Sequence, residues 1–383
     1  MALHPRCNLH LAALILLIFA HWRNPAQAQT APWTLQQSGT TSSLRGIYSI
    51  DNRTAWASGT AGTVLRTIDG GQHWQTCSIP PDGQSLDFRG VQAWDGEKAI
   101  IMSSGPGDKS RLYKTSDGCK SWTLVFKNPD TPDGFFDSFF ADWSEEGGTP
   151  LWIGSILGDP VNGRFRIFDT LDSGASWKPR TSETLALGTL SVAGFAASNT
   201  LFPANQDNLH NSHIFATGGK SGAFVWLEKT SDHSWKSIRL PLAQGAESTG
   251  IFSIASRSEP SQFRTVIARN QTLIAVGGDY QKPSETTTGT AAWSADSGVT
   301  WTASTTPPHG YRSSVAWSPE FEAWITAGPN GFDISRDDGK TWQPLDNGNL
   351  NDGNWNALSL PFAVGPNGRI ARISAKNLPA PKP

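Results

Sequence analysis

Short segments in which hydrophobic and polar residues alternate follow one another along most of the chain. In one stretch, LRGIYSI (44–50), TAWASG (54–59) and TVLRTI (63–68) each have the period of two that is typical of a β-strand. The turn residues DGG (69–71) follow, and HWQTC (73–77) then opens a fourth strand. Four short strands joined in sequence predict one antiparallel meander.

An aspartate turn ends the third strand of this unit and recurs along the chain. Its motif, Ser/Thr-x-Asp-x-Gly-x-x-Trp, begins as TIDGGQHW (67–74), and a shortened copy reads TSDHSW (230–235). We expect the carboxylate to accept backbone N–H groups two residues on, the glycine to take a positive φ, and the tryptophan to pack between sheets. These are folding roles and not catalytic ones. The aspartates recur 41 to 64 residues apart, at Asp69, Asp117, Asp172, Asp232, Asp296 and Asp337.

A second series of glycine-rich turns, between the second and third strand of each unit, counts the units independently. Seven such turns occur, at 58–62, 104–110, 154–163, 217–222, 277–289, 327–331 and 364–368. The last unit has only three strands, and PWTLQQSG (32–39) supplies a strand that completes it. We therefore predict an all-β fold, a seven-bladed propeller of four-stranded antiparallel blades over residues 29–376, closed by the N-terminal strand in the last blade.

The N-terminus has the pattern of an export signal. His4 and Arg6 precede the apolar run LAALILLIFA (11–20), and the small residues of AQA (26–28) follow. We expect a signal peptide over residues 1–28, an exported protein in the periplasm or outside the cell, and a C-terminal tail at 377–383. Ten apolar residues are too few for a comfortable membrane span, and no later apolar run approaches the length of one.

Cysteine usage agrees with an oxidising compartment. Cys77 and Cys119 lie in adjacent units, and an exported protein permits a disulfide between them. Two buried free thiols are the alternative, because sequence does not fix the distance that a disulfide requires.

Composition narrows the classes of partner. Gly and Pro number 38 and 25, Trp numbers 17, and the formal net charge is -2. Such a charge gives no reason to expect nucleic acid or an anionic membrane as a partner. No metal or cofactor motif is complete: His210 and His213 form an isolated pair, and the acidic loop at 142–148 lacks the EF-hand ligand order. We expect no cofactor, no metal and a monomer.

Two of the units resemble a known family. WASGTAGTVLRTIDGGQHW (56–74) and FEAWITAGPNGFDISRDDGKTW (321–342) are similar to units of the photosystem II stability and assembly factor family. The resemblance covers nearly the whole chain after the signal peptide, and it implies an exported seven-bladed propeller with Asp boxes, also called BNR repeats, that binds a protein partner during assembly. Sialidases and other glycosidases also carry Asp boxes. Cys119 replaces the motif glycine in the second unit, which departs from the pattern.

Candidate site residues lie where the innermost strands begin, because inner strands line the channel of a propeller. Arginines open three of these strands, and basic groups there suit a carboxylate, a phosphate or an acidic peptide. The alternative is that each arginine pairs with an aspartate and holds the blades together. The predicted channel-mouth patch comprises Arg45, Arg89, Asp137 and Arg312 of the inner strands, together with Asp159 and Arg164 of the turn GDPVNGR (158–164).

A glycoside hydrolase is the rival hypothesis. Sialidases use three arginines and a tyrosine nucleophile, and Tyr311 adjoins Arg312. The Phe-Arg-Ile-Pro signature is absent, however, no Glu is matched to Tyr311, and sialidases have six blades. Asp137 and Asp159 are the candidate carboxylate pair for another glycosidase, whose mechanism their separation would decide. The sequence thus predicts a non-catalytic protein-binding or assembly scaffold, with a sialidase-like or other glycoside hydrolase as the alternative.

Overall fold

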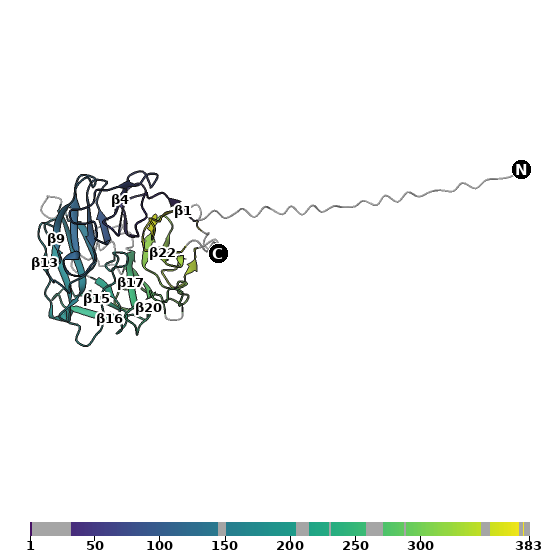
Figure 1. Ribbon diagram of the computed structural model, residues 1–383. Coiled ribbons are helices and arrows are strands. Elements are labelled where there is room, and N and C mark those ends of the chain that lie inside the picture. Colours follow the sequence, from purple (N-terminus) through teal and green to yellow (C-terminus); the bar gives the residue numbers. More distant parts are fainter. Residues whose placement is uncertain are drawn as a thin grey trace. The chain divides into compact units, whose positions relative to one another are not determined.

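Seven antiparallel sheets follow one another along the chain and form the blades of a propeller (Figure 1). This computed structural model describes residues 1, 32–144, 151–203, 214–229, 231–257, 271–286, 289–345, 353–374 and 378. The expected signal peptide, His210 and His213, and most of the C-terminal tail lie outside the described residues. The seven blades predicted from the repeats are confirmed.

The first three blades each contain four strands in sequence order. Blade one consists of β2 (Leu44–Ser49), β3 (Ala55–Gly59), β4 (Val64–Thr67) and β5 (Gln75–Thr76). Blade two consists of β6 (Phe88–Ala93), β7 (Ala99–Ser103), β8 (Arg111–Thr115) and β9 (Thr123–Lys127), with the short 3-10 helix η1 (Gly107–Lys109). Blade three consists of β10 (Phe136–Ser144), β11 (Leu151–Val161), β12 (Arg164–Thr170) and β13 (Lys178–Pro179), followed by η2 (Glu183–Leu185).

The remaining blades keep this plan, with a variation at the fourth and at the last. Blade four has β14 (Ile214–Thr217), β15 (Phe224–Glu228) and β16 (Trp235–Arg239). Blade five has β17 (Thr249–Arg257), β18 (Thr272–Asp279), β19 (Ala291–Ser294) and β20 (Thr302–Ala303). Blade six has β21 (Ser314–Ser318), β22 (Ala323–Gly328), β23 (Gly331–Ser335) and β24 (Gln343–Pro344). Blade seven has β25 (Ala357–Ser359), β26 (Phe362–Val364), β27 (Ile370–Ile373) and β1 (Trp33–Gln36).

Blade four has an irregular inner edge in place of a regular inner strand. Ala193 and Gly218 exchange both of their backbone hydrogen bonds, at 2.9 and 3.1 Å, and the N–H of Ala216 donates to Leu201 O at 3.0 Å. Between these contacts the N–H of Ala197 donates to Phe195 O, and Asn199 takes a φ of 60°. This tight turn and the left-handed residue interrupt the ladder, so the segment lines the channel without continuous pairing.

The ring closes through the N-terminal strand, as the sequence predicts. In blade seven the order of strands is β1-β27-β26-β25, and β1 runs antiparallel to β27 from Trp33 opposite Ile373 to Gln36 opposite Ile370. Figure 1 shows β1, in purple, beside the yellow C-terminal strands. Because the first and last strands share one sheet, neither is left as an open edge.

The repeat aspartates have the folding role that the sequence predicts, with a different hydrogen-bond partner. Asp69 Oδ1 accepts the backbone N–H of His73, four residues on, at 3.0 Å, and the Thr67 hydroxyl bonds both Asp69 Oδ1 and the N–H of Gly71 at 2.9 Å. The expected partner two residues on is found only in the shortened copy, where Asp232 accepts the N–H of Ser234. In the first copy, Gly70 and Gly71 take φ values of 80 and 81°. These values curl the turn so that the N–H of His73 reaches the Asp69 carboxylate.

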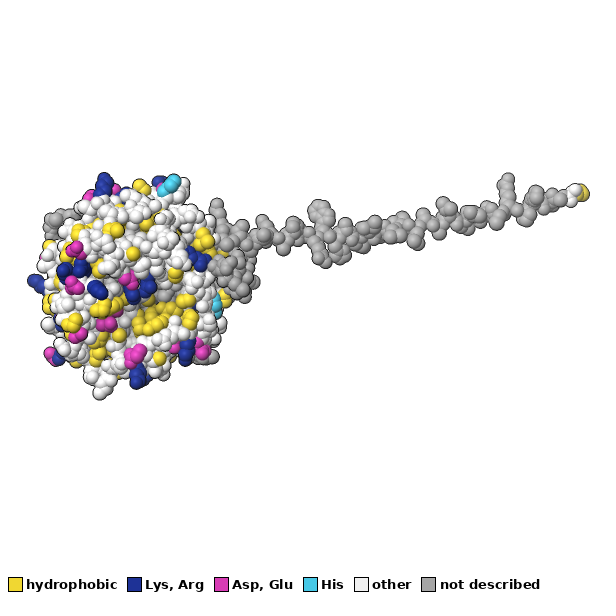
Figure 2. All heavy atoms as spheres, viewed as in Figure 1, with side chains coloured by type: hydrophobic (Ala, Val, Ile, Leu, Met, Phe, Trp, Pro, Cys, Tyr) yellow, Lys and Arg dark blue, Asp and Glu magenta, His cyan; other side chains and the backbone are white. Residues whose placement is uncertain are grey.

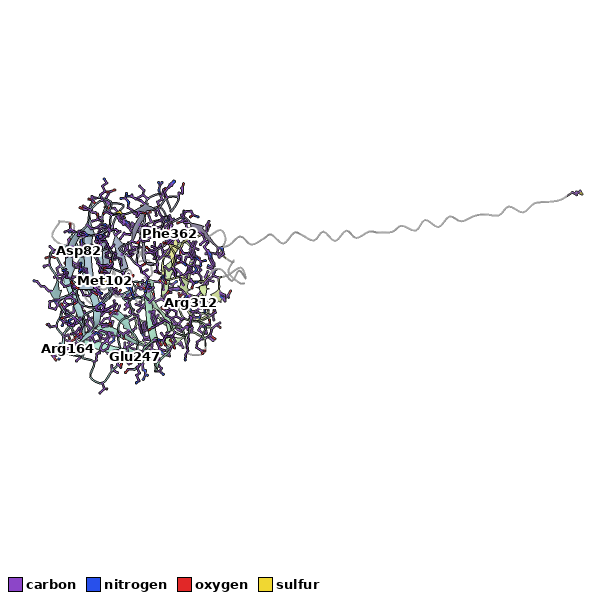
Figure 3. All side chains as sticks on the ribbon, viewed as in Figure 1. Asp82, Met102, Arg164, Glu247, Arg312 and Phe362 are labelled. Atoms are coloured by element: carbon purple, nitrogen blue, oxygen red, sulfur yellow. A yellow bond between two sulfur atoms is a disulfide. The ribbon has the colours of Figure 1, made fainter. Side chains whose placement is uncertain are left out.

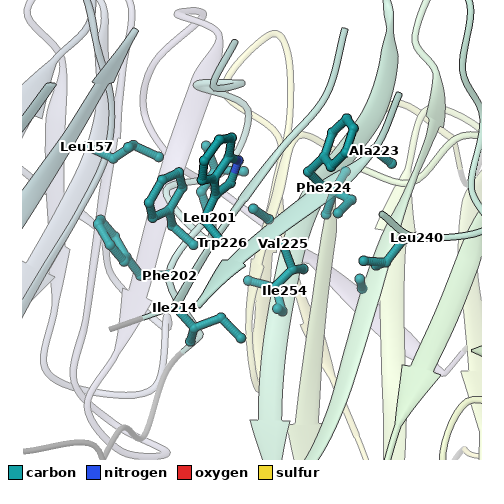
Figure 4. Close-up of a cluster of buried hydrophobic side chains, with 14 of the residues drawn as sticks. Leu157, Leu201, Phe202, Ile214, Ala223, Phe224, Val225, Trp226, Leu240 and Ile254 are labelled. Carbon is teal, nitrogen blue, oxygen red and sulfur yellow. The ribbon is translucent and has the colours of Figure 1, made fainter. Parts of the chain in front are cut away.

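Apolar side chains fill the space between neighbouring blades. One cluster joins blades three, four and five, and includes Leu157, Phe224, Trp226 and Ile254 (Figure 4). Four of the motif tryptophans are buried and two, Trp177 and Trp301, are partly buried; the ring of Trp74 of blade one meets that of Phe362 of blade seven edge to face, with centroids 5.7 Å apart. The predicted packing of these tryptophans between sheets is therefore what the structure shows.

A disulfide links the first two blades at their outer side. Cys77 follows β5 and Cys119 lies in the turn between β8 and β9, with a Cα–Cα distance of 5.3 Å. The Ser78 hydroxyl also donates to Cys119 O at 2.8 Å. The disulfide closes a loop between residues 42 positions apart, which removes conformational freedom from the unfolded chain.

We expect the double variant Cys77→Ser with Cys119→Ser to lose about 2–4 kcal/mol of unfolding free energy, because its unfolded state regains the freedom of that loop. Urea unfolding with and without a reducing agent measures this loss. The reductant should lower the midpoint of the wild-type protein toward that of the variant and leave the variant unchanged. Equal midpoints for all samples would contradict the expectation.

Candidate functional site at the channel mouth

Four inner strands carry a β-bulge at the same position, near their first residue. The register shifts between Leu44 and Gly46, Phe88 and Gly90, Phe136 and Ser138, and Ile251 and Ser253. The bulged residues are Arg45, Arg89, Asp137 and Phe252. Because a bulge leaves its extra residue unpaired and redirects the side chain, these four residues share one level at the entry to the channel. We call this end the channel mouth.

Arg45 brings to the mouth a guanidinium group that makes no hydrogen bond with the described residues. Its side chain is partly buried, and Nε makes no hydrogen bond within the described part of the chain. Burial lowers the pKa of Arg45, as does the nearby Arg89, while Asp87 and Tyr311 act in the opposite direction. Arg45 therefore lies in electrostatic range of blades two and six without a bonded partner.

Arg89 is held by groups of blades two and four. Its Nε donates to Asp87 Oδ2 at 2.8 Å, and a second nitrogen donates to Ala196 O at 3.1 Å. The side chains of Arg89 and Asp87 are 27% and 24% exposed. The other carboxylate oxygen, Asp87 Oδ1, is buried and has no hydrogen-bond partner among the described residues.

Asp137 and Asp159 form a buried carboxyl pair in blade three. Asp137 is 1% exposed, and each side chain is a hydrogen-bond partner of the other. Burial, followed by the charge of Asp159, raises the pKa of Asp137 well above its ordinary value, and Arg89 opposes this rise. Burial raises the pKa of Asp159 to about 6, although the Gly194 N–H, at 3.0 Å from Oδ1, and Asp137 oppose it.

A single proton shared by the pair explains this contact. Oδ2 of Asp137 is buried and receives no hydrogen bond from a donor among the described residues, and the Asp159 carboxyl is its titratable neighbour. Two ionised carboxylates in contact repel each other, so one of them retains its proton. Gly194 seals the pair, because a Cβ there would lie 2.4 Å from Cγ of Asp137.

We expect this pair to make the protein less stable as the pH rises from about 4 through about 6, where Asp159 loses its proton, and further while Asp137 keeps its own. An unfolded aspartate loses its proton near pH 3.9, as model peptides do, whereas the folded pair keeps a proton to higher pH. The folded state then binds more protons over this interval, and its stability falls with rising pH. Asp159→Asn should reduce this decline in the free energy of unfolding by up to about 3 kcal/mol.

Urea unfolding at several pH values between about 4 and about 7 tests the expectation. The matched control is Asp133→Asn, because Asp133 is exposed and lies in the loop that leads into the same blade. The same slope against pH in wild type and in Asp159→Asn would show that the pair does not titrate as described.

Arg312 does not join the channel mouth, so its predicted place there is wrong. Its side chain is 0% exposed, and Nε donates to Asp333 Oδ2 of β23 at 2.6 Å. The N–H of Arg312 bonds Gly277 O of the preceding blade, as the N–H of Leu44 bonds Gly365 O. Arg312 thus corresponds to Leu44 and not to Arg45, and Ser313 occupies the bulge level. An offset of one residue turned the side chain into the blade.

His309 completes the buried ion pair of blade six. Its Nδ1 lies 2.7 Å from Asp333 Oδ1, and the hydrogen bond with Asp333 raises the pKa of His309 although burial opposes it. Burial alone would raise the pKa of Asp333, but Arg312 and His309 together hold it below its ordinary value. The alternative role foreseen for the arginines, a structural ion pair, is the one that Arg312 has.

Arg164 also lies away from the mouth. It begins β12 and meets Glu183 of η2 at 2.6 Å, with side chains 41% and 90% exposed. Figure 3 shows Arg164 and Arg312 on opposite sides of the propeller. The predicted patch is therefore reduced to Arg45, Arg89 and the Asp137–Asp159 pair, with Asp87 added.

An aromatic cluster that sequence reasoning missed forms the other half of the mouth. Phe195 stacks on Phe252 with ring centroids 4.0 Å apart, and Tyr280 meets both rings edge to face. Tyr311 meets Phe252 at 4.7 Å. Tyr280 is 48% exposed and directly follows β18, the second strand of blade five, and Asp159 lies near the end of β11, the second strand of blade three. This shared position was the only available signal.

The geometry does not match the hydrolase arrangements considered from sequence. Tyr311 is 6% exposed, and burial raises its pKa, which disfavours a phenolate nucleophile. Asp137 and Asp159 are in hydrogen-bond contact, whereas glycosidase carboxyls stand at least about 5 Å apart. Within the described ranges, no three or more His, Cys, Asp or Glu side chains are grouped as a metal site would need.

The opposite end of the channel has a different character. A cavity of about 290 Å³ lies there, and its lining includes Tyr48, Phe140, Phe202 and Trp317. None of its lining residues carries a charge. On the face seen in Figure 2, basic and acidic side chains lie interspersed and form no single-sign patch. Among the described residues, the charged groups of the channel therefore lie at the mouth and not around this cavity.

Comparison with solved structures confirms the fold resemblance. YCF48 bound to a D1 peptide matches with a TM-score of 0.56 and 20% identity, over 89% of this chain and 96% of that one. YCF48 from Cyanidioschyzon merolae matches with a TM-score of 0.55 and 17% identity, over 90% and 99% of the two chains. YCF48 is a photosystem II assembly factor. At these identities the similarity establishes a common fold.

The remaining comparisons do not indicate a function. The GH74 enzyme of Niastella koreensis matches with a TM-score of 0.35 and 13% identity, over 83% of this chain and 60% of that one, which supports no conclusion about chemistry. No protein-family model and no curated protein matches the chain. Among the described residues there is no helix of the length and apolar character that a membrane crossing requires.

Proposed function

We propose that this protein is an exported, non-catalytic scaffold that binds a protein partner at the channel mouth. The observation that supports the proposal most directly is Arg45, a partly buried guanidinium at a bulge position with no hydrogen bond to Nε. A polar group held out of water without a partner costs free energy, and a ligand that bonds it recovers that cost. Such a group at the same mouth as the half-exposed Tyr280, with Tyr311 in electrostatic range of both, favours a binding surface over a purely structural one.

The likeness to YCF48 bound to a D1 peptide supports the same class of function. That propeller binds a peptide, and the present chain shares its fold over most of both lengths. Fold alone does not choose a function, so the proposal depends on the groups at the mouth. Export is proposed from the apolar run and AQA in residues 1–28.

Site-specific photo-cross-linking in the native host tests the proposal. A photoreactive residue at Tyr280 should capture a partner, whereas one at the exposed Lys178 of β13 should not capture it. The captured protein is then purified, and its binding is compared between wild type, Arg45→Met and the distant control Arg164→Ala. Loss of affinity in Arg45→Met alone supports the proposal, and equal affinity for all three overturns it.

Export has its own test. N-terminal sequencing of the protein from the periplasm or the medium should begin at Gln29. Retention of residues 1–28 in a cytoplasmic protein would contradict the proposed signal peptide.

A further inference from the structure

The guanidinium of Arg45 has donors and no acceptor in the described structure. No hydrogen bond connects any of its nitrogens to the described protein, and Asp87 and Tyr311 reach it only as electrostatic neighbours. Because no bond holds the group, its side chain can rotate toward a ligand at little cost. Arg45 therefore offers hydrogen-bond donors to a partner.

Asp87 offers the complementary acceptor. Its Oδ2 accepts from Arg89, while Oδ1 is buried and unbonded. A buried acceptor without a partner costs free energy, and an N–H that meets this oxygen when the Asp87 side chain turns outward recovers that cost. A group that bonds both Arg45 and Asp87 must carry an acceptor and a donor close together, as a peptide amide does.

Charge at the mouth argues against a simple anion site. The positive charges of Arg45 and Arg89 face Asp87 and the Asp137–Asp159 pair, which shares a proton and carries one negative charge in that state. The two positive and two negative charges of these five side chains then sum to zero. A carboxylate placed here would gain from Arg45 but would also meet the charges of Asp87 and the pair.

The aromatic cluster of Phe195, Phe252, Tyr280 and Tyr311 lies near both arginines of the mouth. Tyr311 lies in electrostatic range of Arg45, and Ala196, which accepts from Arg89, is next to Phe195. Tyr280, with 48% of its surface exposed, covers the stacked Phe195 and Phe252. An apolar side chain that packs there loses its contact with water.

We infer that the channel mouth recognises an uncharged peptide segment, whose backbone amide bonds Arg45 and Asp87 and whose apolar side chain packs on Tyr280. This inference rests on the proposed function and refines it, because it replaces the acidic partner expected from sequence with a neutral, apolar one. The ligand chemistry follows from paired donors and acceptors, balanced charge and an exposed ring.

Calorimetric titration with three capped heptapeptides tests the inference. All are N-acetylated and C-amidated chains of Gly and Ser, with a central Phe, a central Ala, or a central Phe flanked by two Asp. The neutral Phe peptide should bind at least about tenfold more tightly than the Ala peptide, because its ring is buried. Its affinity should change little between about 50 and about 300 mM salt.

Variants locate the contacts. Tyr280→Ala should remove the difference between the Phe and Ala peptides, and Arg45→Met should weaken both by about tenfold, as expected for one lost hydrogen bond to a charged group. Arg164→Ala should bind like wild type. Thermal unfolding of each variant establishes that it is folded before binding is compared.

Two results would overturn the inference. If the Asp-containing peptide binds more tightly and loses affinity in salt, the mouth is an anion site, and the proposed protein-binding function survives while this inference does not. If none of the peptides binds but cross-linking at Tyr280 still captures a partner, the recognition group is not a neutral peptide amide. Failure of the cross-linking experiment would instead remove the proposed function itself.

Discussion

Deletion of residues 29–40 should destabilise the protein by about 5 kcal/mol or more and expose it to aggregation. The deletion removes β1, including Trp33, which is 5% exposed. The centroid of its ring lies 4.6 Å from that of Phe332 in blade six. Truncation of one buried tryptophan alone costs about 3–5 kcal/mol. Loss of β1 also leaves β27 as an open sheet edge, which invites pairing with other chains.

Urea unfolding and size-exclusion chromatography measure the two consequences of this deletion. A matched pair of single variants on β1 separates packing from mere sequence change: Trp33→Ala should lose most of the stability, whereas Leu35→Ala, at a residue 60% exposed, should lose little. A deletion variant with the wild-type midpoint would show that blade seven does not need its outer strand.

Arg312→Met should cost about 3–5 kcal/mol, because it leaves a buried carboxylate without its charged partner. Asp333 is fully buried, and Arg312 donates to it and to Tyr311 O at 2.8 Å. The same substitution at Arg45 should change stability little, since Arg45 makes no hydrogen bond to the described protein and burial already disfavours its charge. Chemical unfolding of both variants measures the contrast.

A second-site change tests the cause of the Arg312 effect. Arg312→Met combined with Asp333→Leu should recover much of the lost stability, because no unpaired charge remains in the blade. Equal stability of the single and double variants would mean that the loss comes from packing and not from the stranded carboxylate. Equal effects of Met at Arg45 and Arg312 would contradict the assignment of their different roles.

The two arginines also show where sequence reasoning about the site reached its limit. LRGI, FRGV and YRSS look alike, yet the first two arginines are bulged residues, whereas the third lies before β21 at the position of Leu44, one residue earlier. A strand turns every side chain to its other face when its register shifts by one. Nothing local to YRSS reveals this shift, because it is set by pairing with β22 and by the contact with Gly277.

The aromatic residues of the channel mouth could not be predicted from sequence motifs. Phe195, Phe252 and Tyr280 belong to different segments, and no spacing in the sequence connects them. No motif indicates Asp87 either, because its proposed role depends on Oδ1 having no hydrogen-bond partner among the described residues. Asp137 and Asp159 were identified as a pair, but their contact, which disfavours a glycosidase arrangement, required the structure.

The sequence by itself determined the blade count, the strand order within a blade and the closure of the ring by β1. These follow from local chemistry: repeated turn residues and alternating strands act over a few positions and recur in each unit. The tertiary structure alone decided which side chains meet at the channel mouth. Those contacts depend on bulges, register and the approach of blades far apart in sequence, which a one-residue offset is enough to change.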